Sequence, residues 1–132
     1  MTTELPEARP SARVDKPWGH EEIFAQVEGC YVGKTLHVNG GESLSLQWHH
    51  EKDETIAVIS GRVEIDLGTS EDALRAVPVA PGASVHITPG LLHRVRALTD
   101  SVLVEASTAA PGWQEDIVRL DDRYGRRGTQ AP

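Results

Sequence analysis

The chain has 132 residues and a net charge of −7, with 20 acidic residues against 13 lysines and arginines. This length suits one domain with a core of its own. The negative charge argues against nucleic acid or an anionic membrane as a partner, because both bind a basic face. No apolar stretch reaches membrane-spanning length, and the first residues lack the basic start and apolar run of a signal peptide. We therefore expect a cytoplasmic protein.

Three regions follow one another along the chain. Residues 1–13 are rich in Pro, Glu, Ala and Arg without hydrophobic periodicity, which predicts a flexible N-terminal arm. Residues 14–127 form one predicted domain, and residues 128–132 are expected to be a tail. Cys30 is the only cysteine, so no internal disulfide can form, and a single cysteine of this kind is expected in the core.

Short β-rich segments separated by glycine and proline turns fill the predicted domain. In chain order they cover residues 31–38, 44–49, 55–60, 63–67, 77–79, 85–87, 95–98 and 102–105. The last two are expected to pair as a hairpin. Several segments alternate apolar and polar residues, so that one face is buried and the other is wet. This pattern predicts an all-β sandwich or barrel with very little helix.

Four polar residues stand where an apolar core would be expected. Gln47 and His49 are two apart on one strand, so their side chains share a face. Glu54 begins the next strand, and His93 follows the tight turn Pro89-Gly90. Inside a closed barrel these groups can meet, and their nitrogen and oxygen atoms suit one divalent ion such as Zn, Mn, Fe, Co or Ni. A cation would also remove the cost of burying Glu54 beside two imidazoles.

The other polar residues nearby have simpler interpretations. For Gln47 the alternative to ligation is a hydrogen bond from its amide to Glu54. His50 directly follows His49 on the predicted strand, so its side chain points to the opposite face and is expected at the rim of the pocket. Three histidines lack partner spacing and are interpreted as structural: His20, His37 and His86.

The spacing of the polar residues resembles the two cupin motifs. The first motif is matched by Gly41, Gln47, His49, Glu54 and Gly61, and the second by Gly82, Pro89, Gly90 and His93. Cupins usually have His in the place of Gln47. With Gln there, residues 16–126 resemble the cupin domain of bifunctional mannose-1-phosphate guanylyltransferase/mannose-6-phosphate isomerase proteins (type II phosphomannose isomerases). The matching pieces include Lys16-Pro17-Trp18-Gly19, Leu44-Ser45-Leu46-Gln47-Trp48-His49-His50, Ser60-Gly61, His93-Arg94, Asp116-Ile117-Val118-Arg119 and Tyr124-Gly125-Arg126.

The resemblance implies a single-domain cupin, which is a double-stranded β-helix or jelly-roll barrel. It also implies that Lys34 and Arg94, which match basic residues of the family, contact the substrate as catalytic residues. The alternation of side chains along a strand argues against a substrate contact by Arg94. The neighbour of an inward-facing His93 points outward unless the strand bulges. The chain is too short to include the nucleotidyltransferase domain of those proteins. Thr55 and Glu51 differ from the family near the pocket, which allows for a different substrate.

Three functions follow from these features. The first is a metal-dependent isomerase of the mannose-6-phosphate isomerase kind, in which the metal stabilises an enediolate and an unassigned base moves a proton between C1 and C2. The second is a metal-dependent oxygenase or lyase acting on a small carbonyl or enol compound. The third is a non-catalytic sugar- or metabolite-binding domain. The expected partners are a small-molecule substrate of the sugar-phosphate class and a second copy of the chain, because a homodimer would cover an apolar face with Leu44, Leu46 and Trp48.

Overall fold

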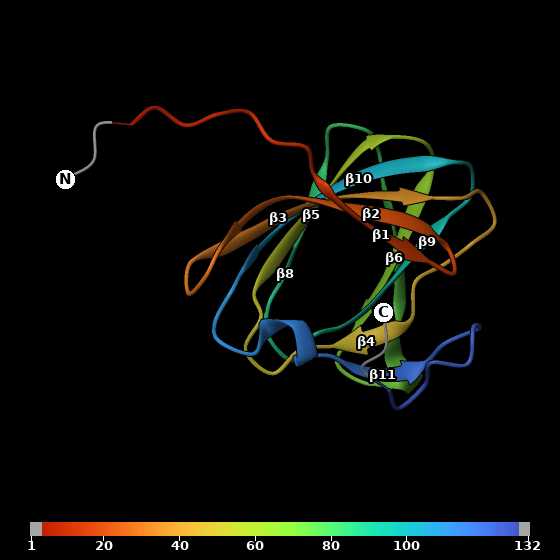
Figure 1. The fold of residues 1–132 in the computed structure, drawn as a ribbon. Helices are drawn as coiled ribbons and strands as arrows, with labels where there is room; N and C mark the ends of the chain where they lie inside the picture. Colours follow the sequence, from red (N-terminus) through yellow and green to blue (C-terminus); the bar gives the residue numbers. More distant parts are fainter. Residues whose placement is uncertain (1–3, 130–132) are drawn as a thin grey trace.

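The structure is a computed structural model that describes residues 4–129. Two antiparallel sheets face each other and enclose the interior of the domain (Figure 1). In spatial order the larger sheet contains β1 (Ala12–Lys16), β2 (Gly19–Val27), β3 (Tyr31–Val38), β10 (Ser101–Thr108), β5 (Glu54–Ser60) and β8 (Ser84–Ile87). The smaller sheet contains β11 (Val118–Asp121), β4 (Leu46–Trp48), β9 (Leu92–Ala97), β6 (Val63–Gly68) and β7 (Arg75–Val79).

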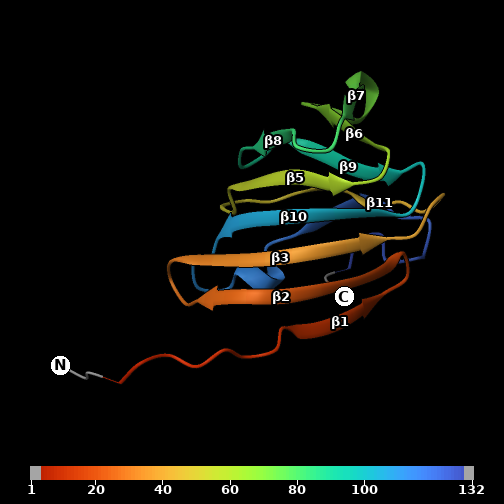
Figure 2. The same cartoon turned by 90° about the horizontal axis from the view of Figure 1, so that it is seen from above.

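Strands that are distant in sequence are neighbours in the larger sheet. β10 lies between β3 and β5 and pairs with both, and Figure 2 shows the strands of this sheet side by side. Two short 3-10 turns, η1 (Glu71–Ala73) and η2 (Trp113–Glu115), are the only helical elements within residues 4–129. The prediction of an all-β fold with very little helix is therefore confirmed.

The described part of the chain contains no helix that is long and apolar enough to cross a membrane. The cytoplasmic location stays a prediction from the sequence.

The inward faces of several strands change from apolar to polar at one level of the barrel. The pairs that mark this change are Leu103 and Glu105 on β10, Ile56 and Glu54 on β5, Leu36 and Lys34 on β3, and Val95 and His93 on β9. Because the strand register places Glu105 opposite Lys34 and Ser107 opposite Glu54, the polar residues gather in one part of the interior. The apolar residues fill the rest, and Val58, Ile65 and Leu103 are completely buried there.

The sequence Lys16-Pro17-Trp18-Gly19 forms the turn between β1 and β2. Trp18 is buried in the core. Gly19 has a φ of 149°, and a Cβ at this position would collide with the carbonyl oxygen of His37. Only glycine therefore allows β2 to begin this close to β3. The close approach at Gly19 holds β2 and β3 in register.

Two expectations about chain organisation are wrong. β9 and β10 form no hairpin, because β9 pairs with β4 and β6 whereas β10 pairs with β3 and β5. Their short connection crosses from one sheet to the other. Cys30 is exposed in the turn between β2 and β3 instead of lying in the core.

The domain limits predicted from the sequence agree only approximately with the strands. β1 begins at Ala12, inside the predicted arm of residues 1–13. Residues 1–3 of that arm and residues 130–132 of the predicted tail lie outside the described residues.

The apolar face that suggested a homodimer is absent from the described surface. Leu46 is buried and Leu44 packs against the core, while Trp48 is half-buried with its ring edge against His50. Large exposed apolar side chains lie instead on the larger sheet, where Phe24 and Ile59 are the most exposed examples within the strands. The homodimer remains a prediction, but the exposed apolar face from which it was predicted is not present in the described residues.

Candidate functional site

Two histidines and one glutamate converge in the polar part of the barrel interior. His49 directly follows β4, Glu54 begins β5 and His93 is the second residue of β9. The Oε2 atom of Glu54 lies 3.5 Å from Nε2 of His49, and its Oε1 atom lies 3.2 Å from Nε2 of His93. All three side chains are at most 3% exposed. We call these three residues the inner cluster, and their predicted convergence is observed.

In the neutral form of each ring, the hydrogen bond at Nδ1 leaves Nε2 without a proton. Nδ1 of His49 lies 2.6 Å from the carbonyl oxygen of Asp116, and Nδ1 of His93 lies 3.0 Å from that of Leu91. A carbonyl oxygen only accepts hydrogen bonds, so Nδ1 must donate in each neutral ring. Each Nε2 then directs a lone pair at the carboxylate of Glu54. Two lone pairs beside an anion repel it, and this tautomer is the one that metal-bound histidines adopt.

Two buried atoms of the inner cluster make no hydrogen bond of regular geometry. They are Nε2 of His49 and Oε2 of Glu54, and Oε2 has only an ion pair with Nζ of Lys52 at 3.1 Å. Burial lowers the pKa of His49, although the charge of Glu54 opposes this effect, so the ring is held neutral. Unsatisfied buried polar atoms are costly, and a divalent cation bound between the three side chains would satisfy both atoms. The donor set therefore fits a metal ion.

Gln47 borders the inner cluster from β4. The hydroxyl of Ser45 donates to its Oε1 atom at 2.7 Å, and its Nε2 atom lies 3.4 Å from Nε2 of His93. In this orientation the amide presents its NH₂ group, which cannot bind a metal. A hydroxyl both donates and accepts, so Ser45 would equally bond an amide turned by 180°. The turned amide would present its oxygen to the cluster.

A buried lysine supplies positive charge beside the inner cluster. Nζ of Lys52 lies 3.1 Å from Oε2 of Glu54 and 3.0 Å from Oε2 of Glu105, and all three side chains are less than 10% exposed. Burial by itself would raise the pKa of Glu54, but the charge of Lys52 opposes this effect, and the pKa lies well below its ordinary value. Lys52 itself stays charged, because its two carboxylate partners raise its pKa against the effect of burial.

Asp116 holds the loop that carries His49 and Lys52. Its carboxylate accepts hydrogen bonds from the backbone N–H groups of His50, Glu51 and Lys52 at 2.7–2.9 Å. Burial favours a higher pKa for Asp116, but these three donors outweigh it and lower the pKa. Its carbonyl oxygen fixes the ring of His49 at the same time. Asp116 therefore positions residues of the site through both its carboxylate and its backbone carbonyl.

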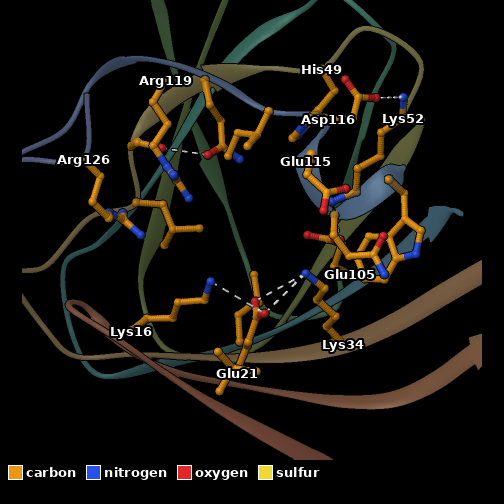
Figure 3. A pocket seen from close by; sticks show the side chains of 18 of the residues that line it. Lys16, Glu21, Lys34, His49, Lys52, Glu105, Glu115, Asp116, Arg119 and Arg126 are labelled. Carbon is orange, nitrogen blue, oxygen red and sulfur yellow. Dashed lines mark hydrogen bonds and ion pairs between the residues drawn. The ribbon is translucent and has the colours of Figure 1, made fainter. Parts of the chain in front are cut away.

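A cavity of about 360 Å³ adjoins the inner cluster. His49 and Gln47 line it, while Glu54 and His93 lie behind them. Figure 3 shows His49, Lys52 and Glu105 on one side of this cavity and Lys16, Arg119 and Arg126 on the other. The cavity thus has a carboxylate and imidazole end and a basic end.

The basic end carries more positive charge than its carboxylates neutralise. Arg126 pairs with Asp122 at 2.9 Å, but the Nε atom of Arg119 is buried without a partner. Burial and the nearby charge of Arg126 lower the pKa of Arg119. Burial also lowers the pKa of Lys16, against the attraction of Glu21 at 3.8 Å. Cations that are buried together in this way favour an anionic ligand.

Lys34 lines the same cavity, as the sequence predicted. Its Nζ atom lies 3.4 Å from Oε1 of Glu21 and 5.3 Å from the ring centre of Trp113. It therefore stands between the two ends of the cavity, already paired with one carboxylate.

The structure does not bring Arg94 to the cavity. Its Nε atom donates to Asp66 at 2.9 Å, and its guanidinium also contacts Asp121. Arg94 follows the inward-facing His93 on β9 without a bulge, so strand alternation turns it outward. Its predicted contact with substrate thus lacks structural support. His50 is exposed at the rim, as expected.

Sequence reasoning missed several polar residues of the cavity as candidates. Lys16, Arg119 and Arg126 appeared only within the matching motifs, and Glu105 had no distinguishing feature except its place in a predicted strand. A buried polar residue at an inward position of a predicted strand, such as Glu105 after Leu103, is the pattern that could have identified it.

Residues 5–122 match the family model for the C-terminal domain of mannose-6-phosphate isomerase. The chain belongs to this family. It is 32% identical over 122 residues to the xanthan biosynthesis protein XanB of Xanthomonas campestris, covering 91% of this chain and 25% of that protein. It is 30% identical over 113 residues to mannose-1-phosphate guanylyltransferase 2 of Escherichia coli O157:H7, covering 84% of this chain and 22% of that one.

Among solved structures, the capsular polysaccharide assembling protein CapF of Staphylococcus aureus superposes with a TM-score of 0.75 at 21% identity, covering 86% of this chain and 32% of that one. This likeness and the family match confirm the predicted cupin fold of this mannose-6-phosphate isomerase C-terminal domain. The chain spans about a quarter of the length of the curated relatives it matches.

Proposed function

We propose that this domain is a metal-dependent aldose–ketose isomerase that acts on a sugar phosphate such as mannose 6-phosphate. One observation carries the proposal. Two imidazole lone pairs and a carboxylate converge at one end of a cavity whose other end holds buried, incompletely neutralised cations. A sugar phosphate has matching ends, with a carbonyl and hydroxyl group at C1 and C2 and a phosphate at the far carbon.

The metal end would be formed by the inner cluster together with Gln47. His49, Glu54 and His93 supply two nitrogens and one carboxylate, and Gln47 supplies an oxygen if its amide is turned. This donor set suits Zn, Mn, Fe, Co or Ni. When bound, such an ion supplies Lewis acidity that polarises a carbonyl and stabilises negative charge on its oxygen. Three or four protein ligands leave a position for the substrate.

The phosphate end would be formed by Lys16, Arg119 and Arg126. The partnerless Nε of Arg119 offers a buried donor, and a guanidinium binds a phosphate through parallel hydrogen bonds. The role that family resemblance gave to Arg94 thus passes to arginines near the end of the chain. Lys34 would contact the sugar between the two ends.

Glu105 is the carboxylate that we assign to proton transfer. It lines the cavity, and its Oε2 atom accepts hydrogen bonds from Lys52 and from the hydroxyl of Ser107 at 3.0 and 3.3 Å. A carboxylate held in this way can take the proton from C2 of the sugar and return it to C1. Glu21 also lines the cavity, but Lys16 and Lys34 both face its carboxylate.

The test combines metal content with an activity assay. We expect purified protein to contain a divalent metal and to interconvert mannose 6-phosphate and fructose 6-phosphate. His93→Ala and Glu54→Ala should remain folded but lose the metal and the activity, whereas the matched control His50→Ala should keep both. Arg119→Gln should raise KM for the phosphorylated sugar more than it lowers kcat. A metal-loaded protein that converts neither sugar would contradict the proposal.

The composition of the inner cluster also favours a second candidate. Two histidines and one carboxylate with open positions form the ligand set of iron oxygenases. Oxygen uptake with an enolic compound, in a protein inactive on both sugars, would support an oxygenase; conversion of that compound without oxygen uptake would support a lyase. Binding of a sugar phosphate without turnover would support a non-catalytic binding domain.

A further inference from the structure

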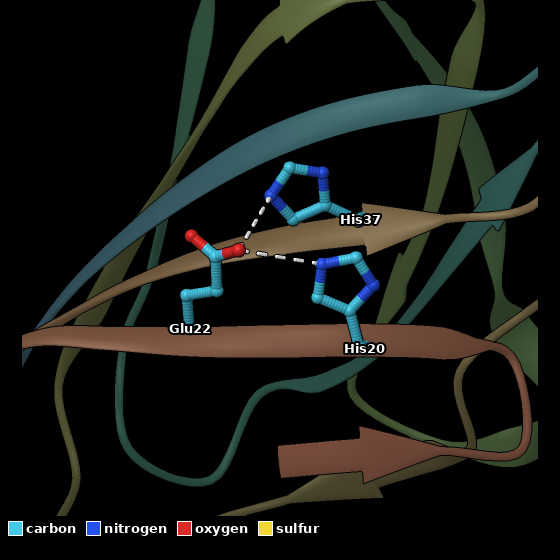
Figure 4. A group of neighbouring side chains, drawn as sticks. All are labelled: His20, Glu22 and His37. Carbon is cyan, nitrogen blue, oxygen red and sulfur yellow. Dashed lines mark ion pairs between the residues drawn. The ribbon is translucent and has the colours of Figure 1, made fainter. Parts of the chain in front are cut away.

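A second group of two histidines and one glutamate lies on the outer face of the larger sheet. His20 on β2 is directly opposite His37 on β3, and Glu22 is two residues further along β2 on the same face. Figure 4 shows the two rings and the carboxylate turned toward one another. We call these three residues the outer cluster. They lie outside the cavity and play no part in the proposed reaction.

The spacing of the outer cluster matches that of metal ligands. Oε1 of Glu22 lies 3.5 Å from Nε2 of His20 and 4.0 Å from Nε2 of His37. Ligand atoms around a tetrahedral ion with bonds of about 2.1 Å are about 3.4 Å apart. The rings are stacked with centroids 4.3 Å apart. All three side chains are 21–39% exposed, so the two rings have room on the solvent side to rotate toward a common ligand position.

No other group competes for these three side chains. Within residues 4–129 they form ion pairs only with one another. Asp15 is opposite His20 on β1, and Arg13 is opposite Glu22, but the charge of Arg13 is directed to Asp15 at 2.9 Å. On the other side β10 contributes an apolar neighbour, Val102 opposite His37. Of these neighbours only Arg13 is a cation, and its charge is paired with Asp15.

We propose that His20, Glu22 and His37 bind a second divalent metal ion of the borderline class, such as Zn²⁺, Ni²⁺ or Cu²⁺. Two imidazole nitrogens and one carboxylate oxygen are the donors that these ions prefer. The register that brings them together is maintained by Gly19, whose lack of a side chain allows β2 to approach His37. Water would complete the coordination, since the face is open to solvent.

The test is the number of Zn²⁺ ions that bind per chain. The metal-stripped 132-residue chain is titrated with Zn²⁺ by calorimetry, and bound zinc is measured by elemental analysis after desalting. We expect two equivalents for the unmodified protein and one for the His20→Ala/His37→Ala double variant. His86→Ala is the matched control, because His86 is an exposed histidine on the same sheet that pairs with Asp53. This variant should retain two equivalents.

A variant of the inner cluster makes the two sites distinguishable. His93→Ala should also reduce the count from two to one, and the remaining equivalent should disappear when the outer double substitution is added. An unchanged count in the outer double variant, with folding verified by circular dichroism, would overturn this proposal and leave the inner site intact. One equivalent that is lost with His20 and His37 but not with His93 would support the outer site and contradict the inner one.

Discussion

The inner and outer clusters each contain two histidines and one glutamate, but in very different surroundings. The inner side chains are 1–3% exposed, and the outer ones are 21–39% exposed. The inner cluster needs Lys52 to balance its carboxylate and needs two backbone carbonyls to orient its rings. The outer cluster has none of these supports, since water can solvate its groups.

This difference shows how burial changes what a metal ion does for the protein. In the interior a charge without a partner costs several kcal/mol, so folding stability and metal binding are coupled. On the surface water screens the same charges, and ion pairs there contribute little. The inner cluster should therefore report metal binding through stability, whereas the outer one should report it mainly through stoichiometry.

The largest expected effect is that of Lys52→Met. The substitution leaves the carboxylates of Glu54 and Glu105 buried without their shared cation, which should lower the unfolding free energy of the metal-free protein by about 3 kcal/mol. Saturating Zn²⁺ should restore much of this loss, because the ion replaces the missing charge beside Glu54. Urea denaturation with and without zinc measures both values. The control Arg13→Met removes an exposed cation near the outer cluster and should change stability by less than about 0.5 kcal/mol. Equal losses of unfolding free energy in both variants would show that burial does not distinguish the two clusters.

An intermediate effect is expected from pH. Burial lowers the pKa of His49 in the folded protein below the ordinary value of 6.5. As pH falls below 6.5, the unfolded chain takes up a proton at this residue before the folded protein does, so stability decreases with decreasing pH. For the metal-free protein this one group should contribute at most about 1.4 kcal/mol per pH unit. Denaturation curves at pH 7.5, 6.5 and 5.5 measure the slope. His49→Gln should lack this contribution. An unchanged slope of unfolding free energy against pH in this variant would show that another group causes the pH dependence.

The smallest effect is expected for His37→Ala in the absence of metal. The ring is half-exposed and makes no buried hydrogen bond among the described residues, so the unfolding free energy should change by less than about 0.5 kcal/mol. Thermal or urea denaturation of the metal-free variant checks this value. A loss above 2 kcal/mol would show that the outer cluster is a structural element of the sheet.

Local pattern predicted most strands between residues 31 and 105 and identified the polar residues of the inner cluster, but it gave no prediction for β1, β2 or β11. Strand alternation depends only on neighbouring residues, so it placed Gln47 and His49 on one face and turned His50 outward. The same rule opposed Arg94, which the structure shows in contact with Asp66. Glycine and proline turns predicted where strands end. The spacing of the two cupin motifs predicted that His93 of the second motif lies near His49 and Glu54 of the first. Whether these residues bind a metal is still a prediction.

Long-range pairing decided what the sequence could not. β9 and β10 are adjacent in the chain but enter different sheets, because each strand's partners are chosen by packing and hydrogen bonding across the whole domain. The same pairing brings Lys16 from one end of the chain to Arg119 and Arg126 from the other, and sets His20 against His37. Side-chain alternation is a property of a few residues, whereas the register of two distant strands depends on every contact between them. For that reason the basic end of the cavity and the outer cluster emerged only from the tertiary structure.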